Sequence, residues 1–176
     1  DQVPRVIGNL SFKKDLYPED LAQFGYLYSQ KEDKWHISDQ AIDFLYLGDS
    51  DIDFQIPGTL NIIRNYNKSF LDMVGYNLYT IDQLDKIPDN QMSFLSCKDS
   101  DEIFDKLSTL RKCIVVLETD AKSSYASFRR FFIECINNGI LNPIIIKRFY
   151  NMATREETLI YASTDIGGLQ IDGFGD

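Results

Sequence analysis

The chain has few of the residues that build metal sites and hydrolytic centres. Its 176 residues include one His, three Cys and one Trp. A single histidine, His36, argues against a His-based metal site and against Ser-His-Asp hydrolysis. The cysteines Cys97, Cys113 and Cys135 are odd in number and lack the paired spacing of a metal motif. We therefore expect buried, reduced thiols in a cytoplasmic protein, and no metal or cofactor bound by this chain.

Several short motifs with a known chemistry are also missing. The sequence contains no GxGxxG, no Walker loop and no GxSxG. The acidic stretch Asp49–Asp53 lacks the glycine and the terminal glutamate of a calcium loop, so it is interpreted as a solvated turn. No apolar run reaches the roughly 20 residues that a membrane helix needs. We therefore expect no catalytic residues in this chain and no membrane-spanning segment.

Charge and composition limit the possible partners. The chain carries 27 acidic and 18 basic residues, a formal net charge of −9. An acidic surface repels phosphate backbones and anionic membranes, so neither nucleic acid nor membrane is an expected partner. The hydrophobic fraction of 44% and the many Phe and Tyr residues can supply a sizeable core. We expect one domain over residues 1–176, cut from a larger protein because both ends of the sequence look truncated.

Strand and helix patterns alternate in the C-terminal half. Apolar runs predict strands at Met92–Ser96, Cys113–Leu117, Ile144–Ile146 and Leu169–Asp172. Helical patterns begin near Ser100, at Ser123 or Ser124, and at the capping box of Thr154 and Glu157. This alternation is typical of parallel βαβ units.

The second of these helices has the clearest pattern. We expect Gly139 to end it in a left-handed conformation. Its predicted apolar face consists of Tyr125, Phe128, Phe132, Cys135 and Ile136.

The N-terminal half adds weaker signals. Strands are predicted at Val3–Ile7, Phe44–Leu47 and Leu60–Ile63, with a helix that starts at Pro18. Thr80 and Gln83 form a further capping box. Seven or eight strands with helices between them predict an α/β fold, a complete or distorted β/α (TIM-like) barrel. An open doubly wound sheet fits the same pattern.

Two arginines are weak candidates for an anion site. Arg148 ends the predicted strand at Ile144–Ile146, and Arg155 lies at the start of the next helix. Strand C-terminal ends and helix N-termini form the usual ligand side of β/α folds. A solvated rim without a ligand is the alternative interpretation.

The C-terminal tail contains an unusual glycine pattern. Residues 167–176 read GGLQIDGFGD, in which glycines permit close packing and positive φ angles. The tail resembles the glycine-rich stretch of the long, three-domain form of 4-hydroxy-3-methylbut-2-enyl diphosphate synthases, the GcpE or IspG family. Thr154–Ile160, Ile144–Ile146 and Arg129–Phe132 are similar to segments that precede these glycines in the family. Gln170 departs from the apolar residue usual at its position.

The resemblance implies that this chain is the central insert of such a synthase. In the whole enzyme, an N-terminal barrel binds 2-C-methyl-D-erythritol 2,4-cyclodiphosphate, and a C-terminal domain holds a 4Fe–4S cluster. Reduced ferredoxin or flavodoxin supplies the electrons that open the ring in non-mevalonate isoprenoid biosynthesis. The insert would be a barrel-like spacer, with the other two domains as its partners. The resemblance assigns none of the family's cluster ligands or substrate-binding residues to this chain.

Two further hypotheses stay open. One is a free-standing β/α domain that binds a phosphorylated small molecule through Arg148 and Arg155. The other is an acidic module on which an electron donor docks, favoured only by the negative charge.

Overall fold

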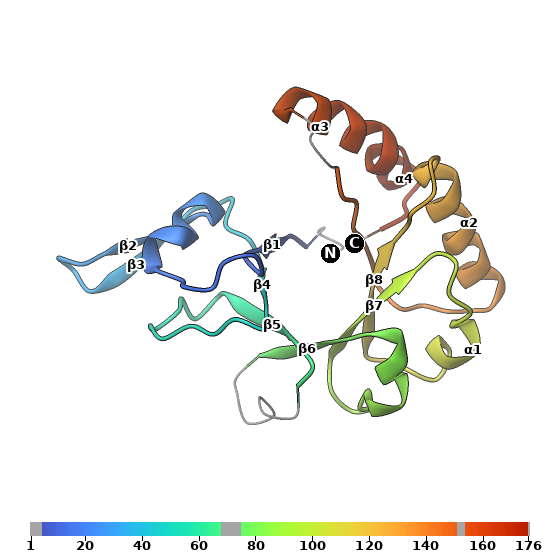
Figure 1. Ribbon diagram of the computed structural model, residues 1–176, viewed down its shortest axis with the longest axis horizontal. Coiled ribbons are helices and arrows are strands. Elements are labelled where there is room, and N and C mark those ends of the chain that lie inside the picture. Colours follow the sequence, from blue (N-terminus) through green and yellow to red (C-terminus); the bar gives the residue numbers. More distant parts are fainter. Residues whose placement is uncertain (1–4, 68–74, 151–153, 176) are drawn as a thin grey trace. The chain divides into compact units, whose positions relative to one another are not determined.

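The computed structural model describes residues 5–67, 75–150 and 154–175 (Figure 1). Two residues of the first predicted strand, Val3 and Pro4, and the last tail residue, Asp176, lie outside this part. The described residues up to Leu78 form one compact unit (unit 2), and those from Tyr79 onward form a second (unit 1).

Parallel strands form the framework of both units. The larger sheet has the hydrogen-bonded strand order β1-β4-β5-β6-β7-β8-β9, and every pair of its strands whose register is defined is parallel. The α/β class and the parallel βαβ units are therefore confirmed. The strands of this sheet are β1 Ile7–Asn9, β4 Phe44–Gly48, β5 Asn61–Asn65, β6 Tyr76–Tyr79, β7 Ser93–Lys98, β8 Cys113–Glu118 and β9 Ile144–Ile146.

Of the predicted complete or distorted barrel, the complete form is wrong. The strand order of the described residues begins at β1 and ends at β9, so these two strands are edges and the sheet is open. The strands follow one another as they do in part of a β/α barrel, without closing the ring. A doubly wound sheet would reverse its strand order at a switch point, and this order does not reverse.

In unit 2, the connection between β1 and β4 contains elements that the sequence pattern did not predict correctly. The helix that starts at Pro18 is a 3₁₀ helix, η1 (Pro18–Phe24), ended by Gly25 at φ 87°. An antiparallel hairpin follows, made of β2 (Tyr26–Ser29) and β3 (Lys34–Ile37). The unit's core consists of Leu10, Leu16, Leu21, Tyr26, Ile42, Leu45, Leu47, Leu60 and Ile62.

In unit 1, helices connect the parallel strands. The 3₁₀ helix η3 (Ile81–Lys86) has the predicted capping box and precedes β7. Between β7 and β8, α1 (Phe104–Leu107) begins later than the cap predicted at Ser100. The Asp101 carboxylate accepts a hydrogen bond from the Lys98 backbone N–H (2.6 Å) and closes a turn that delays the helix. Figure 1 shows α1 and α2 on the same side of β7 and β8.

The helix α2 (Ser124–Asn137) is rotated relative to the predicted apolar face. Phe131 is 1% exposed, whereas Ile136 is 64% exposed, so the prediction missed the first residue and wrongly included the second. Ser123 is the N-cap, and Gly139 has φ 65°, as predicted. The buried residues of α2 are Ser124, Phe128, Phe131, Phe132 and Cys135.

The strand predicted at Leu169–Asp172 is wrong, because this segment is helical. The capping box at Thr154 starts α3 (Arg155–Ala162), which continues through the π-helical η4 (Ser163–Gly167) into α4 (Gly168–Ile171). Gly167 and Gly168 adopt helical φ angles, so neither glycine ends the helix. Leu169 is fully buried while Ile171 is 88% exposed, a pattern that suits one helix face.

The two glycines of this helix should respond oppositely to alanine. A methyl group at Gly167 meets no atom within 4 Å, whereas at Gly168 it would lie 2.9 Å from Cε2 of Tyr125. We expect Gly167→Ala to raise the free energy of unfolding by about 0.5–1 kcal/mol, because alanine favours the helix. Gly168→Ala should lower it by about 1–2 kcal/mol through overpacking. Urea denaturation of both variants measures this; equal effects would contradict the packing of α4 on α2.

Candidate functional site

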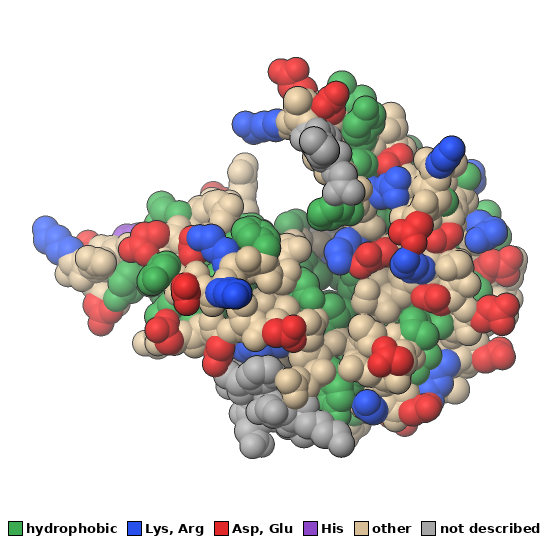
Figure 2. All heavy atoms as spheres, in the orientation of Figure 1, with side chains coloured by type: hydrophobic (Ala, Val, Ile, Leu, Met, Phe, Trp, Pro, Cys, Tyr) green, Lys and Arg blue, Asp and Glu red, His purple; other side chains and the backbone are tan. Residues whose placement is uncertain are grey.

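The carboxyl ends of parallel strands are the usual ligand side of β/α folds, and in unit 1 this edge is rich in charge. Glu118 ends β8 and accepts hydrogen bonds from Nζ of Lys147 (2.7 Å) and Oγ of Ser96 (3.4 Å). Nζ of Lys98, at the end of β7, pairs with Asp120. These charges neutralise one another within the protein. On the face shown in Figure 2, acidic and basic side chains lie interspersed over the unit's helices.

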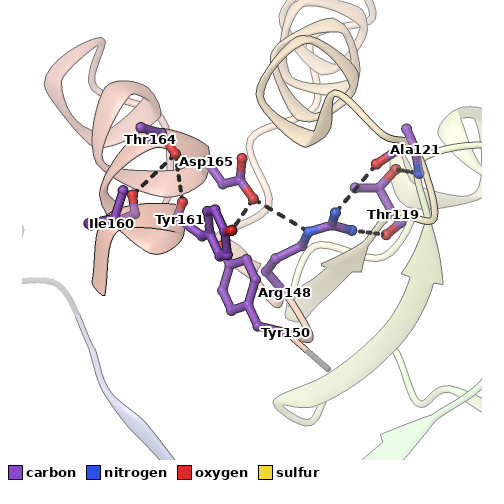
Figure 3. A network of polar contacts seen from close by, with 8 residues as sticks. All are labelled: Thr119, Ala121, Arg148, Tyr150, Ile160, Tyr161, Thr164 and Asp165. Carbon is purple, nitrogen blue, oxygen red and sulfur yellow. Dashed lines mark hydrogen bonds and ion pairs between the residues drawn. The ribbon is translucent and has the colours of Figure 1, made fainter. Parts of the chain in front are cut away.

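The Arg148 guanidinium holds together three segments of this edge (Figure 3). Nη1 donates to the Thr119 carbonyl (2.8 Å), and Nη2 donates to the Ala121 carbonyl (3.5 Å). Nε lies 3.5 Å from Oδ2 of Asp165 in η4. The Arg148 side chain is 20% exposed. It therefore links the end of β9 to the β8–α2 loop and to η4.

Tyr150 completes this network. Its hydroxyl donates to Oδ2 of Asp165 (3.1 Å), and its ring packs against Tyr161 with 5.9 Å between centroids. Burial, followed by the hydrogen bond to Asp165, raises the pKa of Tyr150 to about 12. The phenol therefore stays protonated at neutral pH and acts as a hydrogen-bond donor, not as a general base.

The two arginines proposed from the sequence have different surroundings. Arg148 directs its guanidinium to backbone carbonyls and to Asp165. Arg155 is the exposed first residue of α3, and its side chain makes no hydrogen bond or ion pair with the described residues. Thr154 and Glu157 bond to each other's backbone at this helix start. An anion site at Arg148 and Arg155 stays a prediction.

Asp99 was not among the predicted site residues, although it lies at the same edge, directly after β7. Its side chain is 10% exposed, accepts a hydrogen bond from Ser127 in α2, and lies 3.7 Å from Nη2 of Arg130. Burial alone would raise the pKa of the Asp99 carboxyl, but hydrogen bonds from Ser127 and Thr119 and the Arg130 charge hold it below the ordinary 3.8. The ionised carboxylate therefore ties β7 to α2.

The lowered pKa of Asp99 makes stability depend on pH. Its contribution is fully present above the unfolded pKa near 3.8 and is lost as the pH falls through the lower folded pKa. We expect Asp99→Asn to reduce the free energy of unfolding by about 1–2 kcal/mol at pH 7. The difference from wild type should shrink in acid. Urea denaturation across pH, with the exposed Asp89→Asn as control, measures this; a pH-independent difference would contradict it.

The cysteine side chains lie in the core of unit 1. Cys97, Cys113 and Cys135 are free thiols and buried. Burial raises the pKa of Cys97, the pKa of Cys113 to about 12, and that of Cys135 to about 11. The thiols are therefore protonated at neutral pH and pack as small apolar side chains. Among the described residues, no group of three His, Cys, Asp or Glu side chains could hold a metal ion.

In the part of the chain that the structure covers, no helix combines the length and the apolar character needed to cross a bilayer.

Comparison with known proteins gives a distant relative. The chain is 25% identical over 77 residues to a protein of Phocaeicola vulgatus, the 4-hydroxy-3-methylbut-2-en-1-yl diphosphate synthase (flavodoxin). The matched stretch is 44% of this chain and 12% of that enzyme. The chain is therefore distantly related to this synthase over part of its length. No family model and no solved structure matches.

Proposed function

We propose that the chain is a structural domain of a protein related to 4-hydroxy-3-methylbut-2-enyl diphosphate synthase, and that it corresponds to the central insert of the three-domain form. The partial similarity to the Phocaeicola vulgatus enzyme supports this proposal. Under this proposal, the parent protein is cytoplasmic. Flavodoxin or ferredoxin delivers electrons to a 4Fe–4S cluster held elsewhere in that protein. The partners of this domain are then the other domains of the same polypeptide.

The observation that best supports a structural role is the pairing of charges at the carboxyl edge of unit 1. At this edge, Glu118, Arg148 and Asp165 all make contacts within the chain. A binding site for a diphosphate would instead present donors toward open solvent. The domain acts by geometry, since it holds two catalytic modules at a fixed separation.

Single cysteine variants of the full-length protein test the position of the cluster. Replacing Cys97, Cys113 or Cys135 with alanine should leave the iron content of the purified protein unchanged, because these thiols lie in a hydrophobic core. A matched Cys→Ala change at a cysteine of the proposed cluster domain should abolish the iron content. Loss of iron in any of the three core variants, with the protein still folded by circular dichroism, would contradict the proposal.

The alternative of a phosphorylated ligand rests on Arg155, which is exposed at the start of α3. Calorimetry of this chain with the cyclic diphosphate separates the two functions. A purely structural domain should give no heat beyond dilution. Micromolar binding that is lost in Arg155→Met would favour the alternative. Binding of flavodoxin that weakens steeply with salt would instead favour the docking module.

A further inference from the structure

Unit 2 contains a pocket of about 400 Å³ beside the β2–β3 hairpin. Its walls come from the hairpin, from Pro18 at the start of η1, and from the segment Phe54–Gly58. This volume lies in the range of small-molecule sites in proteins. All of the lining residues belong to unit 2.

Three aromatic side chains form one wall. The ring centroids of Tyr28 and Trp35 are 5.1 Å apart, and those of Trp35 and Phe54 are 6.3 Å apart. Trp35 and Phe54 also pack against the core of unit 2, which supports them from behind. The Trp35 indole N–H donates to the Gln55 carbonyl (3.0 Å). The wall is therefore held in place, and its indole donor is already used.

One charged residue lines the pocket, and it is acidic. Asp33 accepts a hydrogen bond from the Tyr28 hydroxyl, which raises the pKa of that phenol and keeps it protonated. The lining contains no Lys, Arg or His. The neighbouring Lys34 pairs with Glu32 at 2.9 Å. The pocket lining thus combines an acidic side chain with three aromatic rings and has no basic group to attract an anion.

We propose that this pocket binds a small organic cation, an alkylammonium or quaternary ammonium group. The negative faces of aromatic rings attract such a cation, and Trp is the most effective of them. The Asp33 carboxylate adds the opposite charge at the wall. A phosphate ester would meet the same carboxylate, and the repulsion disfavours its binding.

Choline chloride, titrated into the full chain, is a suitable probe. Trp35 is the sequence's one tryptophan, so intrinsic tryptophan fluorescence reports on the pocket directly. We expect a saturable change with a dissociation constant in roughly the millimolar range, measured against sodium chloride at equal ionic strength. The neutral isostere 3,3-dimethyl-1-butanol should bind at least about tenfold more weakly, because it keeps the shape and loses the charge.

Two variants assign the effect to the pocket. Asp33→Asn should weaken choline binding several-fold; asparagine suits the positive φ of 49° at this position, so the turn is preserved. Phe54→Leu, which removes one ring, should weaken it about tenfold. Asp15→Asn, an exposed acid outside the lining, is the matched control and should bind as wild type does.

Two results would overturn the inference, and both come from the wild-type chain. One is the absence of saturable choline binding by fluorescence and by calorimetry. The other is equal affinity for choline and its neutral isostere, which would make the pocket merely apolar. The lining residues all lie within residues 18–58 of unit 2. Choline binding is therefore expected whether or not the chain supports a synthase.

Discussion

Replacing Arg148 with methionine should lower the free energy of unfolding by about 2–3 kcal/mol. Methionine keeps much of the apolar stem but removes the guanidinium that bonds the carbonyls of Thr119 and Ala121. These acceptors would lose their donors, and Asp165 would lose its positive partner. Urea denaturation followed by circular dichroism gives the difference directly.

Arg155→Met is the matched control for this change. Arg155 is exposed and makes no contact of this kind with the described residues, so its replacement should change stability by no more than about 0.5 kcal/mol. Equal effects of the two changes would show that the Arg148 network contributes little. If Arg148 instead served an anion, added phosphate would stabilise the wild type and not the variant.

Phe131→Ala should destabilise the chain by about 3–5 kcal/mol, the usual cost of emptying a buried aromatic site. Phe131 is 1% exposed, and its ring packs against Phe104 with 5.2 Å between centroids. The cavity would lie between α2 and α1, where it removes contacts from both helices. Thermal and urea unfolding should both detect the loss.

Ile136→Ala tests the rotation of α2 from the other side. Ile136 is 64% exposed, so its truncation should change stability by no more than about 0.5 kcal/mol. If Ile136→Ala lowered the free energy of unfolding as much as Phe131→Ala, the helix would instead bury the face predicted from the sequence.

The buried strands could be predicted from sequence because both of their faces are covered. Residues 113–117 and 144–146 are continuous apolar runs, and the structure has strands at both. The segment Leu169–Asp172 shows the limit of this signal, because a short apolar run fits a strand or one helix face. Barrel closure is a pairing between the first and last strands, and no local pattern encodes it.

The hairpin was missed for a different reason. Its strands carry mixed polar and aromatic residues, and a charged turn at Gln30–Asp33 separates them. Most of β3 is exposed, so the alternation of buried and exposed residues is weak.

The candidate site was only partly predictable. Arg148 could be identified by its place at a strand end, but its main partners are backbone carbonyls in the β8–α2 loop, and carbonyls leave no signature in a sequence. Asp99 gave no signal either, because its role depends on Ser127 and Arg130, more than 25 residues away along the chain.

The open strand order of the described residues leaves β9 as an edge, and Gly175 lies against this strand. Gly175 has φ 93°, and a methyl group there would come within 3.1 Å of Cδ1 of Ile146 and 3.8 Å of the Ile144 carbonyl. The small, left-handed residue therefore lets the backbone come close to an edge strand of the described sheet. Unprotected strand edges invite pairing between molecules, so a side chain at position 175 would push the chain away from an edge that is better covered.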